Sequence, residues 1–397
     1  MNNTLERNDL IQLVVLDFAS FWLNIAGSVV SFTLVYHYRR VFGLLPANIG
    51  LSVSINTISY FIGCMVLSPV VRSLKPRYCV TISLLGMATF LYLFSRTSLL
   101  SFAYLEVFCY GSFNSLLWPS IEMWISRGKE GKALSTATGS FNISWSIGSS
   151  LSTWIAGLLV ERSTYFAFGF SGFVYLSITV FLLSASAINP SIRAAQSEKV
   201  QNKQNHGEDH STPLRFFCWI NAALVNGGVA LIGNIFPLYA QDVLGTDSAQ
   251  TGALLIARGF STFVMFFILG RTNFWRFNRK MILIIMACFS SLFFLASHIQ
   301  NKYLFLPIFI GIGMVNACTY TMSMFHGISG SIKRSQRAAI HETVLNAGGV
   351  CGIITGGYVY QKFSFSTALL MIGIITGTAF VIELIGMRFV RKDPQFA

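Results

Sequence analysis

Twelve long apolar runs dominate this sequence of 397 residues. A helix that crosses about 30 Å of hydrocarbon needs roughly 20 mostly apolar residues. On that scale the runs predict membrane spans at 11–36, 47–70, 78–97, 100–125, 133–160, 163–186, 214–238, 248–270, 280–298, 302–325, 338–360 and 365–388. Backbone polar groups in hydrocarbon must be satisfied within the segment, so each span is expected to be an α-helix. The sequence predicts an all-α integral membrane protein.

The composition agrees with a membrane location and argues against a soluble fold. Hydrophobic residues make up 53% of the chain and charged residues 11%, whereas a soluble domain carries about 25% charged residues. All seven cysteines fall inside or at the margins of apolar runs, so no disulfide framework is predicted. The first run lacks a basic leader and a cleavage site, which indicates a retained span and not a removed signal peptide.

One polar stretch divides the spans into two sets of six. Residues 187–213 are rich in Gln, Asn, Lys, Ser and Glu, a composition typical of flexible linkers. We therefore expect a first six-helix bundle at 1–186, a cytoplasmic linker at 187–213 and a second bundle at 214–397. No other loop is long enough for a soluble domain.

Lys and Arg are distributed unequally between the two sides of the predicted membrane. With the N-terminus inside, 21 of the 28 fall on the inner side, 6 on the outer side and one within a span. This bias predicts that both termini are cytoplasmic in a multi-pass protein of the plasma or inner membrane. It also accounts for the net charge of +13 without nucleic-acid binding, because the basic residues sit in short clusters between apolar runs.

Polar residues within the spans follow a period of three helices. Spans three, six and nine have no Asn, Gln or charged residue in their interiors, and span twelve has only Glu383 near its inner end. Such residues are costly in hydrocarbon and usually face a bundle interior or a cavity. The alternative for any single Asn is that it joins neighbouring helices, but this does not explain the shared phase. The pattern predicts eight helices around a polar interior and four packed outside them.

The polar residues of the eight inner spans are the candidates for binding a substrate. Helical spacing adds a stripe on span four that includes a tryptophan. The predicted substrate-binding residues are Asn24, Asn56, Asn114, Trp118, Asn142, Asn226, Arg258, Asn316 and Asn346.

The two halves echo each other and resemble a known family. Gly148 and Gly157 in span five match Gly348 and Gly357 in span eleven, and the basic loop VVRSLKPRY after span two is echoed by RTNFWRFNRK after span eight. This suggests a duplicated six-helix unit. With the central loop and the glycine-rich span GSFNISWSIGSSLSTWIAGLLVE, nearly the whole chain resembles the major facilitator superfamily. The resemblance implies two pseudo-symmetric bundles that rock around a midplane site.

The sequence also departs from the usual patterns of that family. Its loop after span two lacks an Asp and has Lys75-Pro76 in place of a glycine, and Glu106 stands near the place of an Arg often found in span four. The Gly-Pro signature of drug antiporters is missing from span five. These departures argue against drug-antiporter mechanics and leave the subfamily unassigned.

Arg258 is the most informative single residue, since it lies near the middle of its span. An arginine side chain stays charged and costs several kcal/mol in hydrocarbon unless it is partnered. It predicts a site for a carboxylate or phosphate of the substrate; a permanent ion pair with Asp17 or another acid is the alternative.

Seven further residues carry predicted roles in coupling and gating. Asp17 and Glu106 are acids within spans and are expected to exchange protons with the coupling gradient. By resemblance to the family, an acid–base pair at the inner gate is expected from Arg72 and Glu122. Its counterpart in the second half is expected from Glu342 with Arg271 or Arg337.

Motifs for other chemistry are absent from the sequence. Position 345 is Leu, so His341-Glu342 does not complete the H-E-x-x-H zinc motif, and no metal, cofactor or enzyme activity is predicted. We expect a monomeric secondary transporter that moves a small polar, anionic solute and is coupled to protons or another ion. The alternatives left open are a proton-coupled exporter of amphiphilic or cationic compounds and a lipid flippase on the same fold.

Overall fold

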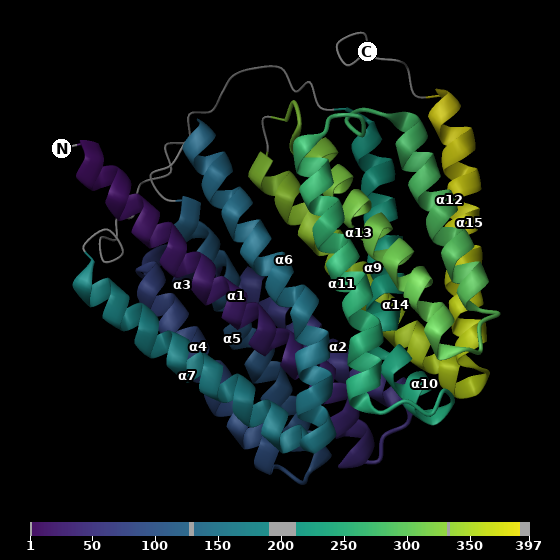
Figure 1. Cartoon of the computed structure of the whole chain (residues 1–397), viewed down its shortest axis with the longest axis horizontal. Helices are drawn as coiled ribbons and strands as arrows, with labels where there is room; N and C mark the ends of the chain where they lie inside the picture. The colour runs from purple at the N-terminus through teal and green to yellow at the C-terminus, as the bar shows by residue number, and fades with distance from the viewer. Residues whose placement is uncertain (1, 127–130, 190–211, 332–333, 390–397) are drawn as a thin grey trace. The chain divides into compact units, whose positions relative to one another are not determined.

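The computed structural model of the chain describes residues 2–126, 131–189, 212–331 and 334–389. These residues fold into α-helices joined by short loops, together with one 3₁₀ turn (Figure 1). The elements are α1 (Asn2–Arg40), α2 (Pro46–Val66), α3 (Ser68–Ser73), α4 (Pro76–Arg96), α5 (Leu100–Ser126), α6 (Gly131–Arg162), α7 (Thr164–Ile188), α9 (Leu214–Asn234), α10 (Phe236–Asp242), α11 (Ser248–Arg271), α12 (Arg279–Ala296), η1 (Lys302–Leu304), α13 (Phe305–Ile328), α14 (Arg334–Lys362) and α15 (Phe365–Phe389).

The prediction of an all-α membrane protein is confirmed. Every predicted span coincides with helical structure, and the outer boundaries agree within a few residues except at the start of α1, which begins at Asn2. Ten of the long helices are long and apolar enough to cross a membrane. The other two, α5 and α14, have 27 and 29 residues and carry several of the polar residues predicted to have a functional role.

Two of the predicted spans are interrupted in the structure. The span predicted at 47–70 breaks at Leu67 between α2 and α3, and the span predicted at 214–238 breaks at Ile235 between α9 and α10. In both cases a proline, Pro69 or Pro237, occupies the first turn of the short second helix. Proline lacks an N–H donor and its ring clashes with the preceding turn, so the helix restarts there.

The helices pack as two compact units. The first contains α1 and most of α2 through α7, and the second contains α9 through α15 together with residues 44–51 at the start of α2. The predicted linker at 187–213 lies largely outside the described residues. Its cytoplasmic placement, and the bundle boundaries at 186 and 214, remain predictions.

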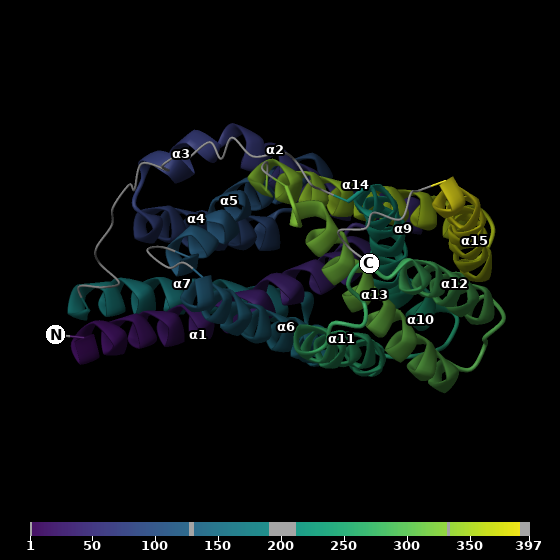
Figure 2. The same cartoon turned by 90° about the horizontal axis from the view of Figure 1, so that it is seen from above.

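Within each unit the long helices pack in pairs. In the first unit α1 packs against α6 and α7, and α4 packs against α5 and α7. In the second unit α9 packs against α14, α11 against α13, and α12 against α15, and these pairings can be followed in Figure 2. The three spans without interior polar residues and the last span are therefore neighbours in each unit: α4 packs against α7, and α12 packs against α15, which carries Glu383. The arrangement of eight helices around a polar interior remains a prediction.

A glycine allows one close helix crossing at matching places in the two units. In the first unit a methyl group on Gly148 of α6 would lie 2.6 Å from the carbonyl oxygen of Phe21 in α1. In the second unit a methyl group on Gly348 of α14 would clash with the carbonyl oxygen of Ala223 in α9. Small residues of this kind let two backbones approach closely, which is how helices pack in lipid. The pairing of Gly148 with Gly348 was predicted from the sequence.

A second crossing repeats in the same way. Gly111 of α5 lies against the backbone carbonyl of Asn56 in α2, and Gly313 of α13 lies against the carbonyl of Arg258 in α11. In each unit a serine donates a hydrogen bond to that same carbonyl: Ser59 to Asn56 at 2.9 Å, and Ser261 to Arg258 at 3.0 Å. Asn56 and Arg258 therefore occupy corresponding positions in the two units: the first unit has a neutral amide where the second has a guanidinium.

These crossings predict that Gly348→Ala destabilises the protein. The added methyl group would meet backbone atoms of α9 that cannot move aside, and overpacking of this kind costs about 1–3 kcal/mol. The measurement is the thermal unfolding midpoint of the detergent-purified protein. Gly172→Ala in α7 is the matched control, because nothing lies within 4 Å of its added methyl group. Equal midpoints for the two variants would contradict the close crossing of α9 and α14.

Candidate functional site

Arg258 lies deep within α11 of the second unit. It is ten residues past the start of the helix, which corresponds to about 15 Å along its axis. The side chain is half-buried, and its Nε atom is buried without a hydrogen-bond partner. Among the described residues the guanidinium makes no ion pair. Within the second unit no described acid forms an ion pair with Arg258. A pair with Asp17, which belongs to the first unit, remains the alternative prediction.

The face of α13 that meets α11 carries polar and aromatic groups. Gly313 contacts the backbone of Arg258, and the ring of Tyr320 packs edge-on against Phe266 of α11 with 5.8 Å between centroids. Asn316 lies between Gly313 and Tyr320 and is half-buried. Residues three and four positions apart share a helix face, so Gly313, Asn316 and Tyr320 follow one another along one face of α13, and this face contacts the backbone of Arg258.

Tyr320 also connects this face to α14. Its hydroxyl donates a hydrogen bond to Oε1 of Glu342 at 3.5 Å, and its ring packs against the imidazole of His341 at 4.9 Å. His341 is fully buried and shares a hydrogen bond of 2.8 Å with Ser323, whereas the Glu342 side chain is 55% exposed. A carboxylate and a guanidinium are therefore held by helices that both contact α13.

The predicted partners of Glu342 lie elsewhere. Its contacts are with Tyr320 and His341, and no described interaction joins it to Arg337 or Arg271. Arg271 is exposed at the end of α11, where its guanidinium lies 3.4 Å from the centroid of the Phe267 ring. The role of these residues in a gate remains a prediction.

Asp17 connects two helices of the first unit. It is half-buried on α1, and its Oδ2 atom accepts a hydrogen bond from the hydroxyl of Ser140 on α6. The neighbouring Ser20 is fully buried and donates to the carbonyl of Leu16 in its own helix. The acid is therefore positioned at the α1–α6 interface, where a change in its protonation would alter the contact between the two helices.

Glu106 is a buried acid in the first unit. Its side chain is 9% exposed, Thr97 donates a hydrogen bond to Oε1 at 3.2 Å, and Oε2 is buried without a partner. The residue borders a small apolar cavity lined also by Leu34, Phe90 and Tyr110. No cation pairs with Glu106 among the described residues, so a neutral carboxyl group suits this place better than a carboxylate.

The predicted asparagines differ in what they contact. Asn226 donates a hydrogen bond across the helix interface to the carbonyl of Leu345 at 2.7 Å, and Asn346 donates to the carbonyl of Glu342 in its own helix at 2.8 Å. Asn24 is buried and its Oδ1 atom faces the hydroxyl of Ser28 at 3.5 Å. Asn226 therefore joins α9 to α14. The sequence pattern alone could not distinguish this structural role from a role in binding a substrate.

The remaining predicted residues are spread over the first unit. Asn56 is half-buried with a buried Oδ1 atom that has no partner. Asn114 and Trp118 are half-buried on α5, with the Trp118 ring 6.4 Å from that of Phe141, and Asn142 is exposed on α6. The amide and indole groups at these positions are accessible to a ligand, but the described contacts do not bring them together into one site.

The predicted inner gate of the first unit is only partly described. Arg72 belongs to α3, but its side chain lies outside the described residues. Glu122 is exposed near the end of α5. The pairing of Arg72 with Glu122 remains a prediction.

Sequence reasoning missed Tyr320 and Ser140, which hold Glu342 and Asp17. Tyr320 follows Gly313 by seven residues, as the predicted Trp118 follows Gly111, so the internal repeat contained a signal for it. Ser140 carries no such signal, because its role depends on how α1 and α6 are aligned. In the described residues no group of three or more His, Cys, Asp or Glu side chains is arranged to hold a metal ion.

Comparison with known proteins places the chain in context. The family model of the Major Facilitator Superfamily matches residues 16–331. No curated protein sequence matches the chain.

Several solved transporter structures share the fold. A bacterial homolog of the human lysosomal transporter Spinster, in an inward-facing and unoccupied conformation, gives a TM-score of 0.78 at 10% identity and covers 98% of this chain and 99% of that one. A POT family transporter in complex with a thioalcohol-conjugated peptide gives 0.76 at 10% identity and covers 96% of both chains. The nucleoside transporter NupG gives 0.73 at 14% identity, with coverage of 95% and 99%.

The contacts of Asn226 predict a structural effect that Asn346 does not share. Asn226→Ala removes the hydrogen bond between α9 and α14, and interhelical hydrogen bonds in membranes contribute about 0.6–1.7 kcal/mol. Asn346→Ala removes only a bond within α14 and should leave the unfolding midpoint nearly unchanged. Thermal unfolding of both purified variants measures the difference, and a larger loss for Asn346→Ala would refute this assignment.

Proposed function

Because the chain belongs to the Major Facilitator Superfamily, we propose that it is a secondary active transporter for a small polar, anionic solute, coupled to protons. Transport by members of this fold requires a site that is exposed alternately to each side of the membrane. We propose that the transporter is a monomer in the cell membrane. Both termini are proposed to be cytoplasmic, because the predicted inner loops carry most of the Lys and Arg residues. Arg258 supports the charge of the solute, and Asp17 and Glu106 support the coupling ion.

The unpaired guanidinium of Arg258 is the observation that carries the proposal. A charged side chain at this depth costs at least about 2.5–3.5 kcal/mol when nothing compensates it. No described acid offsets this charge. An anionic group of the solute would supply the missing counter-charge and form charge-assisted hydrogen bonds, which for Arg with carboxylate or phosphate are often bidentate.

The surroundings of Arg258 suit a small polar solute. Asn316 and Tyr320 on the facing side of α13 offer an amide and a hydroxyl, and the Tyr320 ring offers an apolar face. A few convergent polar groups among aromatic side chains are typical of small-molecule sites. In the first unit the corresponding position is Asn56, a neutral donor and acceptor, so the positive charge at this position belongs to the second unit alone.

The coupling ion is proposed to be a proton, because the two acids involved are held by hydroxyl groups. Asp17 accepts from Ser140, and Glu106 accepts from Thr97. Hydrogen bonds of this kind persist whether the acid is charged or neutral, whereas burial penalises the charged form. Each acid can therefore take up and release a proton without losing its position.

Arg258→Ala is predicted to abolish transport of an anionic solute while leaving the fold intact. The measurement is uptake of radiolabelled carboxylates and phosphates into proteoliposomes, at matched amounts of monodisperse protein. Arg258→Lys should retain only a small part of the activity, because an ammonium group lacks the planar fork of guanidinium. Arg162→Ala, at an exposed helix end, is the control and should transport normally. Normal uptake by Arg258→Ala would refute the proposed anion site.

Asp17→Asn is predicted to uncouple transport from the proton gradient. The amide keeps a hydrogen bond with Ser140 but cannot release a proton, so accumulation against a gradient should fall at least about tenfold, a loss of about 1.4 kcal/mol of coupling. Exchange of labelled for unlabelled solute in the absence of a gradient should persist. Glu106→Gln tests the second acid in the same way. Full accumulation by both variants would exclude these acids from coupling.

A further inference from the structure

A buried acid lies on the inward face of α15, outside the residues discussed so far. Glu383 is 2% exposed, whereas the residues that flank it on both sides, Val381, Ile382, Leu384 and Ile385, are 40–63% exposed. The helix therefore turns its apolar side chains outward and its one carboxyl group into the second unit. An acid on a helix of this kind is costly in an apolar interior unless it is partnered or neutral.

The partner of Glu383 is an amide from another helix. Nδ2 of Asn221 on α9, itself 2% exposed, donates a hydrogen bond to Oε2 of Glu383 at 3.3 Å. Oε1 of Glu383 and Oδ1 of Asn221 are both buried and have no hydrogen-bond partner. The pair thus makes one of the two hydrogen bonds that a carboxyl group and an amide can form, and it leaves two acceptor oxygens facing no donor.

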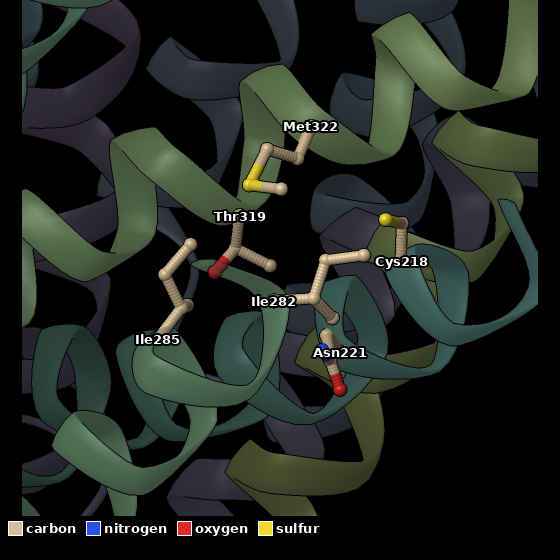
Figure 3. A pocket seen from close by; sticks show the side chains of 6 residues that line it. All are labelled: Cys218, Asn221, Ile282, Ile285, Thr319 and Met322. Carbon is tan, nitrogen blue, oxygen red and sulfur yellow. The ribbon is translucent and has the colours of Figure 1, made fainter. Parts of the chain in front are cut away.

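A small cavity adjoins the pair. It is lined by two side chains from each of α9, α12 and α13, and Figure 3 shows them around it: Cys218, Asn221, Ile282, Ile285, Thr319 and Met322. The Thr319 hydroxyl is already engaged with the carbonyl of Val315 at 2.9 Å. The lining is mainly apolar, so among the described residues the cavity supplies no cation to balance a carboxylate.

The charged and titratable groups on the neighbouring helices do not neutralise Glu383. On α9 the buried thiol of Cys218 interacts electrostatically with Glu383 but supplies no positive charge. On α12 the guanidinium of Arg279 donates to the carbonyl of Met387, at 3.5 Å and one turn beyond Glu383. On α14 the ring of Tyr360 meets α15 at Phe365, toward its opposite end. No salt bridge to Glu383 occurs among the described residues.

We propose that Glu383 and Asn221 form a proton-binding site in the second unit. A proton on Oε1 turns the carboxylate into a carboxylic acid, whose O–H can donate to Oδ1 of Asn221 while Nδ2 continues to donate to Oε2. This closes a cyclic acid–amide pair and satisfies the two oxygens that are left without a donor. Two unpartnered buried acceptors side by side are costly, and one bound proton removes that cost.

A metal cation fits this place less well than a proton. Hard cations take six or more oxygen ligands, and the pair with the adjoining cavity offers only the side-chain oxygens of Glu383, Asn221 and Thr319. The site does not depend on the proposed solute or on coupling through Asp17 and Glu106. Loss of the proton would weaken the contact between α9 and α15. The Asn221–Glu383 contact in the second unit would therefore depend on pH.

The test is infrared spectroscopy of the full-length protein in detergent, which detects the carbonyl stretch of a protonated carboxyl group. We expect wild type to show such a band at neutral pH. The component due to Glu383 should be missing from Glu383→Gln but kept by Glu161→Gln, an exposed acid at a helix end, so it appears in the difference between these two spectra. Asn221→Ala should shift the band to higher frequency, since the acid loses its amide partner. A spectrum of Glu383→Gln identical to that of wild type would overturn the proposal.

Thermal unfolding gives a second, independent readout. A group that is protonated in the folded state and ionises in the unfolded state contributes stability that is lost as pH rises. Between about pH 5 and about pH 9 the midpoint of wild type should therefore fall by more than that of Glu383→Gln. Parallel profiles would contradict a bound proton, as would stabilisation of wild type by sodium over potassium at constant ionic strength. If Glu383→Gln does not fold, the carbonyl band of Asn221→Ala is the test: a shift to higher frequency supports the proposal, and an unshifted band overturns it.

Discussion

Close contact between helix backbones at glycine positions is the interaction on which the rest of this structure depends. In lipid there is little hydrophobic drive for helices to associate, so association relies on dense packing and on hydrogen bonds between helices. Gly148 and Gly348 permit it for α1–α6 and α9–α14, and Gly111 and Gly313 permit it for α2–α5 and α11–α13. Because the same two crossings occur in both units, residue pairs such as Asn56 and Arg258 can be compared directly.

That comparison shows that the two units share a backbone arrangement but differ in the side chains at corresponding positions. The crossing at Gly313 fixes the backbone of Arg258 against α13, and the same helix positions Tyr320 between Phe266 and Glu342. The first unit has an amide at the corresponding place. A scaffold held by backbone contacts tolerates such differences, since the side chains that vary do not hold the helices together. The unpaired guanidinium is then the feature that packing does not require, which is why we assign it to the solute.

Much of the fold could be predicted from the sequence, and less of the site. The span predicted at 248–270 is α11 at Ser248–Arg271, because hydropathy and length decide where a membrane helix lies. The interruptions at Leu67 and Ile235 were missed, since proline is tolerated inside other helices, as Pro119 is in α5. The partners of Asp17 and Glu383, Ser140 and Asn221, could not be predicted, because they depend on the alignment of helices far apart in the sequence.

The central claim is that Arg258 forms part of an anion site, and ligand-induced stabilisation tests it most directly. A ligand at about 100 times its dissociation constant stabilises the folded state by roughly 2.7 kcal/mol, which a thermal-shift assay detects. A panel of small carboxylates, phosphates, sugars, nucleosides and cationic drugs would be compared on wild type and Arg258→Ala. The account predicts that anionic compounds stabilise wild type and that this stabilisation is lost in the variant. Stabilisation by cationic or amphiphilic compounds that persists in Arg258→Ala would contradict it.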